Sequence, residues 1–273
     1  MNILTFDIEE WYCIFINIAE EKKTYSIKDS LLNLLNIMEV HNIKPTFFIL
    51  ASFAKKNPQI IYDIAQKYDI GSHGLNHDLV ESMSYKDFQN DIAESIRILE
   101  DITGKKVTKY RAPGFSISNK EYFKAIVDSG IETDCSLSAI NHSYGNKMID
   151  KSQICIIEYN GIKIKEFPPS IFNFLGKDLG FLGGGYFRLF PYRMLKYCMN
   201  KHRDYNLIYL HPSDFDVNQP MISEYSFLEK FKRRVGVQTA EKKLIRMLSE
   251  FGFTDIVTAE KVIDWSNIPI VQL

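Results

Sequence analysis

Short apolar runs alternate with amphipathic helical segments along the first half of the chain. The apolar runs that predict strands lie at residues 3–6, 46–50, 70–73 and 107–110. One helix between them carries clear boundary signals, because Ser84 stands three residues before Asp87 and Gly104 follows the last apolar position. Strands that are connected through helices pair in parallel. The sequence therefore predicts an α/β fold made of βαβ units.

A hairpin-like segment around residues 150–190 interrupts this alternation. Two β-like runs, at 153–159 and 162–167, flank Asn160-Gly161, and such a pair is typical of a tight hairpin turn. The run of three glycines at 183–185 follows, either as a flexible turn or as a place where the backbone approaches a sugar closely. We therefore expect an irregular hairpin and a Gly-rich insertion within the α/β fold.

The remaining elements resume the alternation towards the end of the chain. We expect a helix from Ser118 to Gly130, a strand at 207–210, a helix at 239–250 and a last strand at 254–257. No shift in composition marks a boundary between these segments. A single domain over residues 1–273 is therefore favoured over two domains.

Composition excludes several classes of protein. The chain of 273 residues is 45% hydrophobic and 25% charged, which excludes a disordered or collagen-like chain. Thirty-three Lys and Arg residues against 34 Asp and Glu residues leave a net charge of -1, so no global field draws the chain onto nucleic acid or an anionic membrane. The four cysteines form no CxxC pair, and we expect free buried thiols.

Two further features concern the location of the protein. The apolar stretches are too short to cross a bilayer, so we expect no transmembrane segment. Residues 1–7 contain no basic segment that leads into an apolar stretch, so we expect no secretory signal peptide. These features together predict a cytoplasmic protein.

Polar residues follow the predicted strands at the points where the strands end. In a parallel α/β barrel the loops after the strands share one face, where active sites lie. Side chains that are far apart in the sequence should therefore converge at that face. The residues at these positions are Asp7, Glu9, His73, His77, Arg111, Asp134 and His211.

Two histidines four residues apart, His73 and His77, suggest a metal site. A carboxylate from Asp7 or Glu9 would complete a site of two histidines and one acid, which leaves a coordination position open for activating water. Two surface or helix-capping histidines are the alternative. The Asp7-x-Glu9 pair also resembles the first motif of haloacid-dehalogenase-type phosphatases, but Trp11 stands where that motif has Thr or Val, and the histidines would have no role.

Four short motifs resemble those of polysaccharide deacetylases with a NodB-type domain (carbohydrate esterase family 4). They occur in the family's order, as Thr5–Glu9, Ser72–His77, Arg111–Pro113 and Leu210–His211. Glu166–Pro168 and Gly183–Arg188 further resemble the subgroup that accompanies exopolysaccharide and O-antigen gene sets. The resemblance implies a distorted (β/α) barrel with fewer than eight regular strands. It also implies a divalent metal in the barrel mouth, with Zn2+ favoured over Co2+, Ni2+ and Mn2+.

The first motif departs from the family pattern. The family has two adjacent acids after T-F, whereas this chain has Asp7 and Glu9 on either side of Ile8. Residues i and i+2 of a strand share a face, so both carboxylates can reach one pocket. The resemblance implies that Glu9, His73 and His77 hold the metal and that Asp7 is the catalytic base.

The resemblance also implies the remaining catalytic roles. His211 would protonate the leaving amine, and Arg111 would hold Asp7 through a charge-assisted hydrogen bond. Asp134 would orient His211 and favour its charged form, or would only cap a turn with Ser136. The backbone N–H of Gly114 would stabilise the oxyanion. Asp214 and Asp216 are expected to be solvated loop acids, and His142 and His202 to be surface residues.

Aromatic residues near the motifs are candidates for stacking against a sugar ring. These substrate-binding candidates are Trp11, Tyr12, Phe115 and Tyr186. Each could instead be a core residue at the barrel rim.

The function implied is the metal-dependent removal of N-acetyl groups from an amino sugar in surface polysaccharide biosynthesis. The substrate would be an N-acetylated sugar or glycan precursor, linked to a nucleotide or a lipid. Two alternatives stay open: a deformylase or another C–N amide hydrolase on the same fold, and a metal-free carbohydrate-binding remnant.

Overall fold

The computed structural model describes residues 1–13, 23, 26–141, 144–174, 176–202, 204–222 and 225–273. Its strands are β1 (Asn2–Ile8), β2 (Thr46–Ile49), β3 (Asp69–Ser72), β4 (Lys109–Tyr110), β5 (Thr133–Asp134), β6 (Cys155–Tyr159), β7 (Ile162–Glu166), β8 (Phe172–Phe174), β9 (Lys177–Leu179), β10 (Asn206–Leu210) and β11 (Ile270–Gln272). Its α-helices are α1 (Lys28–Val40), α2 (Ala51–Lys56), α3 (Pro58–Lys67), α4 (Tyr85–Thr103), α5 (Tyr122–Asp128), α6 (Gly184–Leu189), α7 (Tyr192–Lys201), α8 (Phe227–Arg234), α9 (Val237–Glu250) and α10 (Ile256–Val262). Short 3-10 turns are η2 (Val80–Ser82), η3 (Pro113–Phe115), η4 (Pro212–Phe215) and η5 (Trp265–Asn267).

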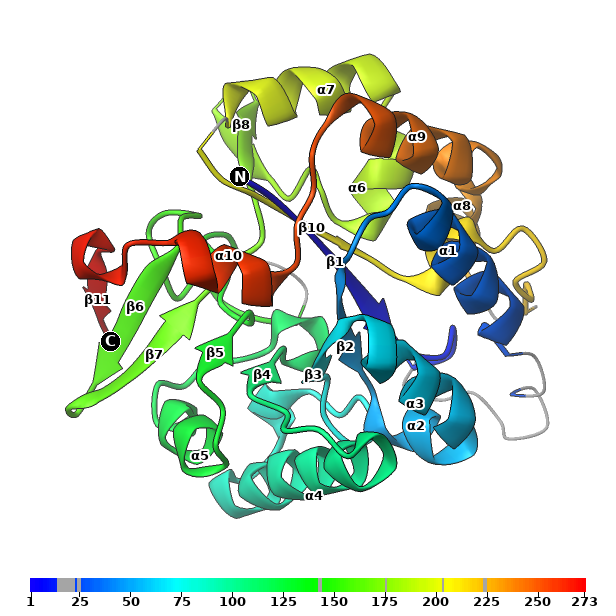
Figure 1. Cartoon of the computed structure of the whole chain (residues 1–273). Helices are drawn as coiled ribbons and strands as arrows, with labels where there is room; N and C mark the ends of the chain where they lie inside the picture. The colour runs from blue at the N-terminus through cyan, green and yellow to red at the C-terminus, as the bar shows by residue number, and fades with distance from the viewer. Residues whose placement is uncertain (14–22, 24–25, 142–143, 175, 203, 223–224) are drawn as a thin grey trace.

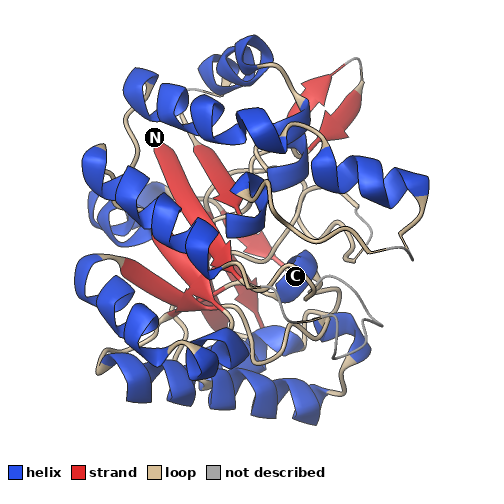
Figure 2. Ribbon diagram, turned by 90° about the vertical axis from the view of Figure 1, so that its right-hand side faces the viewer, coloured by secondary structure: helices blue, strands red, loops and turns tan. Residues whose placement is uncertain are grey.

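A parallel sheet forms the centre of the molecule, with helices packed around it (Figures 1 and 2). Among the described residues it holds nine strands in the order β10-β1-β2-β3-β4-β5-β7-β6-β11. The seven strands from β10 to β7 are mutually parallel, and only β6 pairs antiparallel with its neighbour β7. The predicted α/β barrel with fewer than eight regular strands is therefore confirmed as an arc of seven parallel strands.

The central strands are buried on both faces because helices cover the outside and side chains fill the inside. Phe6 on β1 stacks on Phe47 of β2, with ring centroids 5.6 Å apart. The amphipathic helix α4 begins where the sequence predicts, since the Ser84 hydroxyl accepts a hydrogen bond from the Asp87 backbone N–H. It ends at Gly104, whose φ of 68° suits glycine best.

The hairpin β6–β7 also has the predicted turn. Asn160 and Gly161 have φ values of 50° and 78°, the left-handed conformation that a two-residue turn requires at both positions. The parallel neighbour of β7 is β5, where Asp134 lies beside Glu166. Strands from both halves of the chain thus share one sheet. The organisation of residues 1–273 as a single domain stays a prediction.

Two predicted boundaries are wrong. The helix that was expected to open at Ser118 begins at Tyr122, because the Asn119 side chain accepts from the Glu121 backbone N–H and forms a turn there. Of the strand expected at 254–257, only Thr254 bridges β1, at Ile3, and α10 begins two residues later at Ile256. The Asp255 carboxylate accepts from the Thr258 N–H at 2.7 Å and caps this helix, so the β-branched residues enter a helix instead.

The Gly-rich segment lies against the free edge of β10. Gly183 bridges Tyr209 of β10, and Gly184 opens α6 directly against Asp214. A Cβ atom at Gly183 would lie 2.1 Å from the Tyr209 hydroxyl, and one at Gly184 would lie 2.1 Å from an Asp214 carboxylate oxygen. Glycine is therefore required here for close approach of the backbone to other protein groups.

Replacing Gly184 with Ala is expected to destabilise the protein. The added methyl group must displace the buried Asp214 carboxylate, at a cost of about 1–3 kcal/mol in the free energy of unfolding. Gly185→Ala is the matched control, because a Cβ there has no neighbouring atom within 4 Å. Chemical denaturation of both variants checks this expectation, and equal stabilities would contradict it.

The described helices include none that combines the length and the apolar character needed to cross a bilayer. The four cysteines are free; three are buried and Cys13 is half-buried.

Candidate active site

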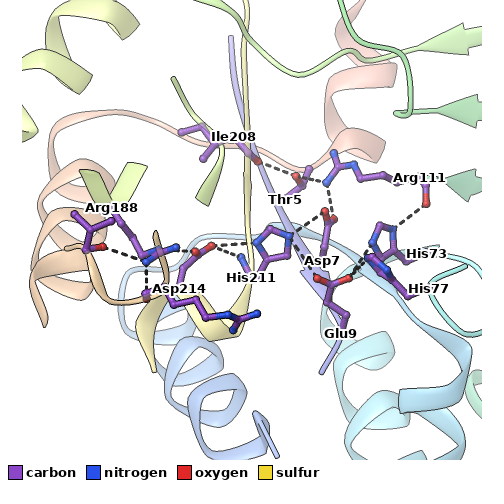
Figure 3. A network of polar contacts seen from close by, with 12 residues as sticks. Thr5, Asp7, Glu9, His73, His77, Arg111, Arg188, Ile208, His211 and Asp214 are labelled. Atoms are coloured by element: carbon purple, nitrogen blue, oxygen red, sulfur yellow. Dashed lines mark hydrogen bonds and ion pairs between the residues drawn. The ribbon is translucent and has the colours of Figure 1, made fainter. Parts of the chain in front are cut away.

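The ends of four strands in one half of the sheet, β10, β1, β3 and β4, bring a set of polar side chains together (Figure 3). Asp7 and Glu9 lie at the end of β1. The two histidines lie in the loop after β3, Arg111 follows β4, and His211 follows β10. These parallel strands end at the same edge of the sheet, which explains the convergence. The residues are Asp7, Glu9, His73, His77, Arg111 and His211.

Glu9, His73 and His77 form a candidate metal centre. One donor atom from each lies within 4.8 Å of the other two. The Glu9 Oε2 atom is 2.7 Å from His77 Nε2 and 3.4 Å from His73 Nε2. The imidazole rings meet edge to face at 5.5 Å between centroids. Two imidazoles and one carboxylate are a donor set that suits Zn2+ and similar divalent ions.

The loop that carries the two histidines is held in a defined shape. Gly74 and His77 both have left-handed backbone, with φ values of 82° and 68°. This conformation is uncommon for a histidine and has to be held by its surroundings. The Leu75 N–H donates to the Asp91 carboxylate at 3.2 Å, and the Gly74 carbonyl accepts from Ala51 N–H. The fixed loop turns the His77 ring back towards Glu9.

The hydrogen bonds and charges around His73 and Glu9 leave both side chains in the protonation states that bind a cation. His73 Nδ1 lies 2.9 Å from the Arg111 carbonyl oxygen, so it donates its proton there and leaves Nε2 as the lone-pair donor. Burial opposes ionisation of Glu9, yet the imidazoles of His77, His73 and His211 hold its pKa well below the usual range. The residues therefore fit a divalent metal.

Asp7 is buried and held by Arg111. The Arg111 Nη1 atom donates to Asp7 Oδ1 at 2.6 Å and to the Thr5 hydroxyl at 2.9 Å. The guanidinium also lies 4.2 Å from the centroid of the Phe48 ring. The other oxygen, Asp7 Oδ2, faces His211 Nε2 at 3.8 Å. One carboxylate oxygen is therefore fixed, and the second stays available to accept a proton.

His211 is oriented by Asp214 and not by the predicted Asp134. His211 Nδ1 lies 3.1 Å from Asp214 Oδ2, which also accepts from the His211 backbone N–H at 2.9 Å. Arg188 Nε donates to the other oxygen, Asp214 Oδ1, at 2.8 Å. The expectation that Asp214 and Asp216 are solvated loop acids is wrong, because both are buried in or beside the turn η4.

The charges around His211 favour its imidazolium form. Burial opposes the charge, but the hydrogen bond and the charge of Asp214, with Glu9 and Asp7 nearby, raise the pKa of His211 to about 9. Asp214 itself stays ionised despite its burial, because His211 and Arg188 lower its pKa. His211 is therefore equipped to donate a proton from Nε2 towards the space beside Asp7 and Glu9.

Asp214→Asn is expected to shift the alkaline limb of the pH–rate profile to lower pH. The neutral amide no longer favours the imidazolium, so His211 loses its proton at a lower pH and activity falls earlier as the pH rises. Asp134→Asn is the matched control and should leave the limb in place. Rate profiles of both variants, on the N-acetylated sugars that the family resemblance implies as substrates, check this; a limb that moves with Asp134 alone would contradict the assignment.

Asp134 belongs to a separate buried pair of carboxyl groups. Its Oδ1 atom accepts a hydrogen bond from Ser136 at 2.6 Å, as the turn-cap alternative anticipates, and its side chain meets Glu166. Burial raises the pKa of Asp134 to about 6 and, together with the neighbouring carboxyl, raises that of Glu166 well above its usual range. The prediction that Asp134 orients His211 is therefore wrong, because the partners of Asp134 are Ser136 and Glu166.

Gly114 lies in a strained turn after β4. Gly114 and Phe115 have φ values of 61° and 53°, both left-handed. The hydrogen bonds of this turn come from Phe115 and Ser116, whose N–H groups donate to Ala112 and Pro113. The Gly114 N–H donates to neither of these carbonyl groups, and a donor to an oxyanion has to be uncommitted in this way. The predicted role of Gly114 as an oxyanion donor stays a prediction.

The aromatic candidates separate into buried and accessible residues. Trp11 is only 2% exposed and packs in the core beside Tyr12, so the prediction that it stacks on a sugar is wrong. Tyr186 is 40% exposed and stacks on Phe190. Phe115 is partly exposed and contacts Tyr209 edge to face at 4.8 Å between centroids. Tyr12, Phe115 and Tyr186 therefore keep accessible surface, and their predicted contact with a sugar stays a prediction.

Two histidines outside the site, His142 and His202, were expected at the surface. His202 is half-buried and its ring stacks on Phe181, so it is not a plain surface residue. His142 lies outside the described residues.

Sequence reasoning missed Asp214, Arg188 and Glu166. A usable signal existed for Asp214, because it stands three residues after His211 in a turn opened by Pro212, the spacing of a capping box. Glu166 and Arg188 stand in the two segments that resemble the subgroup, but their partners, Asp134 and Asp214, are distant in the sequence and become neighbours only in the folded chain.

Comparison with known families divides the chain into two matched segments. Residues 3–133 match the polysaccharide deacetylase family, and residues 135–261 match a domain of unknown function (DUF3473). The peptidoglycan-N-acetylglucosamine deacetylase PgdA of Listeria monocytogenes is 29% identical over 93 residues, which are 34% of this chain and 20% of that protein. PdaA of Bacillus subtilis, a peptidoglycan-N-acetylmuramic acid deacetylase, is 23% identical over 46% of this chain and 51% of that protein.

Solved structures support the fold. A candidate polysaccharide deacetylase from Mycobacterium smegmatis superposes with a TM-score of 0.71 at 15% identity, covering 100% of this chain and 92% of that chain. This chain spans about half or less of the two curated relatives described above. The matched family, the four motifs and the shared fold agree with one another. Residues 3–133 are therefore similar to the polysaccharide deacetylase family, and the chain as a whole shares its fold with a solved structure described as a polysaccharide deacetylase.

Proposed function

We propose that the protein is a metal-dependent N-deacetylase that hydrolyses the acetamide of an amino sugar. The observation that carries the proposal is the juxtaposition of a metal-type donor set with two separate proton-transfer groups. Glu9 Oε1 and Asp7 Oδ2 both lie 3.8 Å from His211 Nε2, so the donor set, the base and the acid surround one small space. Metal-assisted hydrolysis of an amide uses these three functions together.

Each side chain has a distinct task in this proposal. Asp7, fixed through Oδ1 by Arg111, accepts the proton of the attacking water at Oδ2. His211 donates a proton to the departing nitrogen, because an unprotonated amine anion is a very poor leaving group. Asp214 keeps His211 charged and pointed at the site. The Gly114 N–H is placed in the oxyanion-stabilising role.

The metal would be held by Glu9, His73 and His77. When bound, a divalent ion such as Zn2+, or Co2+, Ni2+ or Mn2+, polarises the carbonyl oxygen and lowers the pKa of water. Support comes from the hydrogen bond of His73 Nδ1 to the Arg111 carbonyl, a feature shared by many metal-binding histidines, since they donate their second ring N–H to a fixed acceptor.

We further propose that the substrate is an N-acetylated precursor of a surface glycan, linked to a nucleotide or lipid and processed in the cytoplasm. Support is the resemblance of Glu166–Pro168 and Gly183–Arg188 to the exopolysaccharide and O-antigen subgroup. The curated relatives carry peptidoglycan deacetylase names instead, so peptidoglycan sugars belong among the substrates to be tested.

A carbohydrate-binding remnant is the second candidate function. The same fold occurs in a Bacillus anthracis protein described as a family 4 pseudoenzyme, with a TM-score of 0.52 at 15% identity over 94% of this chain and 64% of that chain. The altered spacing of the two acids in this chain motivates the comparison. The buried Asp7–Arg111 pair and the partly buried His211–Asp214 pair favour an active enzyme.

A release assay separates the candidates. Purified protein with added Zn2+ or Co2+ is incubated with N-acetyl and N-formyl amino sugars, free, nucleotide-linked and as peptidoglycan fragments. Free amine and carboxylate are then quantified. The proposal expects equal amounts of acetate and amine from an N-acetylated substrate. Formate alone would identify a deformylase, and no release from any of the sugars despite bound metal would contradict the proposed reaction.

A further inference from the structure

Helix α8, whose place in the fold Figure 1 shows, carries large apolar side chains that are exposed. The side chains of Phe227, Leu228 and Phe231 are 87%, 57% and 49% exposed. Positions i, i+1 and i+4 lie on one side of a helix, so the three form a continuous surface, called here the α8 face. Single exposed apolar residues need no explanation, but two phenylalanines and a leucine together on eight residues do.

Basic residues accompany the α8 face. Four cationic residues and one acid give Phe227–Arg234 a net charge of +3, within a chain whose net charge is -1. Lys232 and Arg234 are exposed, and Arg234 Nη1 donates to the Val217 carbonyl at 2.9 Å, which ties the end of the helix to the body. A short helix with aromatic and aliphatic residues on one side and Lys and Arg beside them is typical of helices that lie in a membrane interface.

The opposite side of α8 is anchored to the candidate active site. Arg233 is buried and packs its guanidinium 4.8 Å from the centroid of the Tyr225 ring. Its carbonyl oxygen accepts from Arg188 Nη1 at 2.9 Å, and Arg188 in turn holds Asp214. Helix α8 is therefore connected through Arg188 to Asp214, the residue that orients His211.

We infer that α8 docks the protein onto an anionic lipid surface. A bilayer with anionic headgroups accepts both the apolar side chains and the positive charges. A second copy of this chain is disfavoured, because a symmetric contact would bring two +3 helices together. Docking would hold the site close to the membrane, where a lipid-linked glycan precursor is found; this last consequence rests on the proposed function, whereas the docking itself does not.

Vesicle flotation tests the inference without any requirement for activity. The wild-type chain should float with vesicles of phosphatidylcholine mixed with phosphatidylglycerol, and far less with phosphatidylcholine alone. A triple serine variant of the α8 face should bind roughly tenfold or more weakly, since it loses the buried apolar area. The matched control replaces exposed apolar residues on α1, α3 and α10, namely Val40→Ser, Tyr62→Ser and Val262→Ser.

A charge variant completes the test. Lys232→Glu with Arg234→Glu should weaken binding to the anionic vesicles, and Lys86→Glu with Lys106→Glu, on an unrelated exposed region, should not. Circular dichroism confirms that each variant folds. Equal binding by the wild type and the triple variant, or no binding to either vesicle, would overturn the inference. Self-association that the triple variant abolishes, without vesicle binding, would assign the face to a dimer instead.

Discussion

Asp7→Asn is expected to abolish nearly all turnover while leaving the bound metal in place. The asparagine side chain keeps the shape and can still accept a hydrogen bond from Arg111, but it cannot take a proton from water. Loss of a general base costs about 10²–10⁴-fold in rate. The expected result is therefore a large fall in the turnover number with unchanged metal content, measured by acetate release and elemental analysis of the same sample.

Glu9→Gln is the matched comparison, because it makes the same chemical change two residues away. Glu9 faces both histidines, so its amide variant should hold metal more weakly and recover part of its activity in excess metal. If the two phenotypes were exchanged, Asp7 would be the ligand and Glu9 the base. That outcome would show that the shift from adjacent acids to Asp7-Ile8-Glu9 also exchanged their roles.

His211→Ala is expected to damage amide hydrolysis far more than ester hydrolysis. An amine leaves only when its nitrogen is protonated, whereas an alcohol leaves more easily without help. The loss on a sugar acetamide should therefore reach about 10²–10⁴-fold, and the loss on an acetate ester of similar size should be much smaller. Parallel kinetics on the two substrates, with metal content as the control, measure the difference.

Equal losses on amide and ester would demote His211 to a binding or structural residue. The fixed contacts of His211 make this comparison informative. Its Nδ1 atom is occupied by Asp214, so Nε2 is the atom that can face the substrate. A variant that removes the imidazole therefore removes the donor without disturbing the Asp7–Arg111 pair, which comes from other strands.

The parts of the site that could be predicted from sequence lie in short motifs at strand ends. His73 and His77 share one loop, and Asp7 and Glu9 share one strand end, so their relative positions depend on local geometry. The parallel arrangement then brings Arg111 and His211 to the same edge. The fold class and the pair of histidines thus follow from spacing together with one topological rule, whereas spacing leaves Asp7 and Glu9 as alternatives for the acid and the family resemblance favours Glu9.

The sequence-based predictions are wrong for residues whose local position suggests one role while a contact with a distant part of the chain gives them another. Asp134 ends a strand beside the site, yet its register opposite Glu166 gives it a buried carboxyl partner. Asp214 reads as a loop acid, yet the turn after His211 folds it back against the imidazole. Trp11 follows the acids directly, but its ring turns into the core. Each outcome depends on packing partners that are distant in the sequence.

The Gly183–Gly184 pair illustrates the same limit. A run of glycines indicates either flexibility or close approach, and spacing alone does not identify the approaching group. In the folded chain the space that a side chain would need is filled by Tyr209 and Asp214.

The most direct test of the central claim is the amount of divalent metal bound to the dialysed protein. The account predicts one ion per wild-type chain, most readily Zn2+, and none in a folded His73→Ala/His77→Ala variant, which loses two of the three donors that lie within 4.8 Å of one another. Circular dichroism confirms that the variant is folded. Stoichiometric metal retained by that folded variant would contradict the assignment of Glu9, His73 and His77 as the metal site.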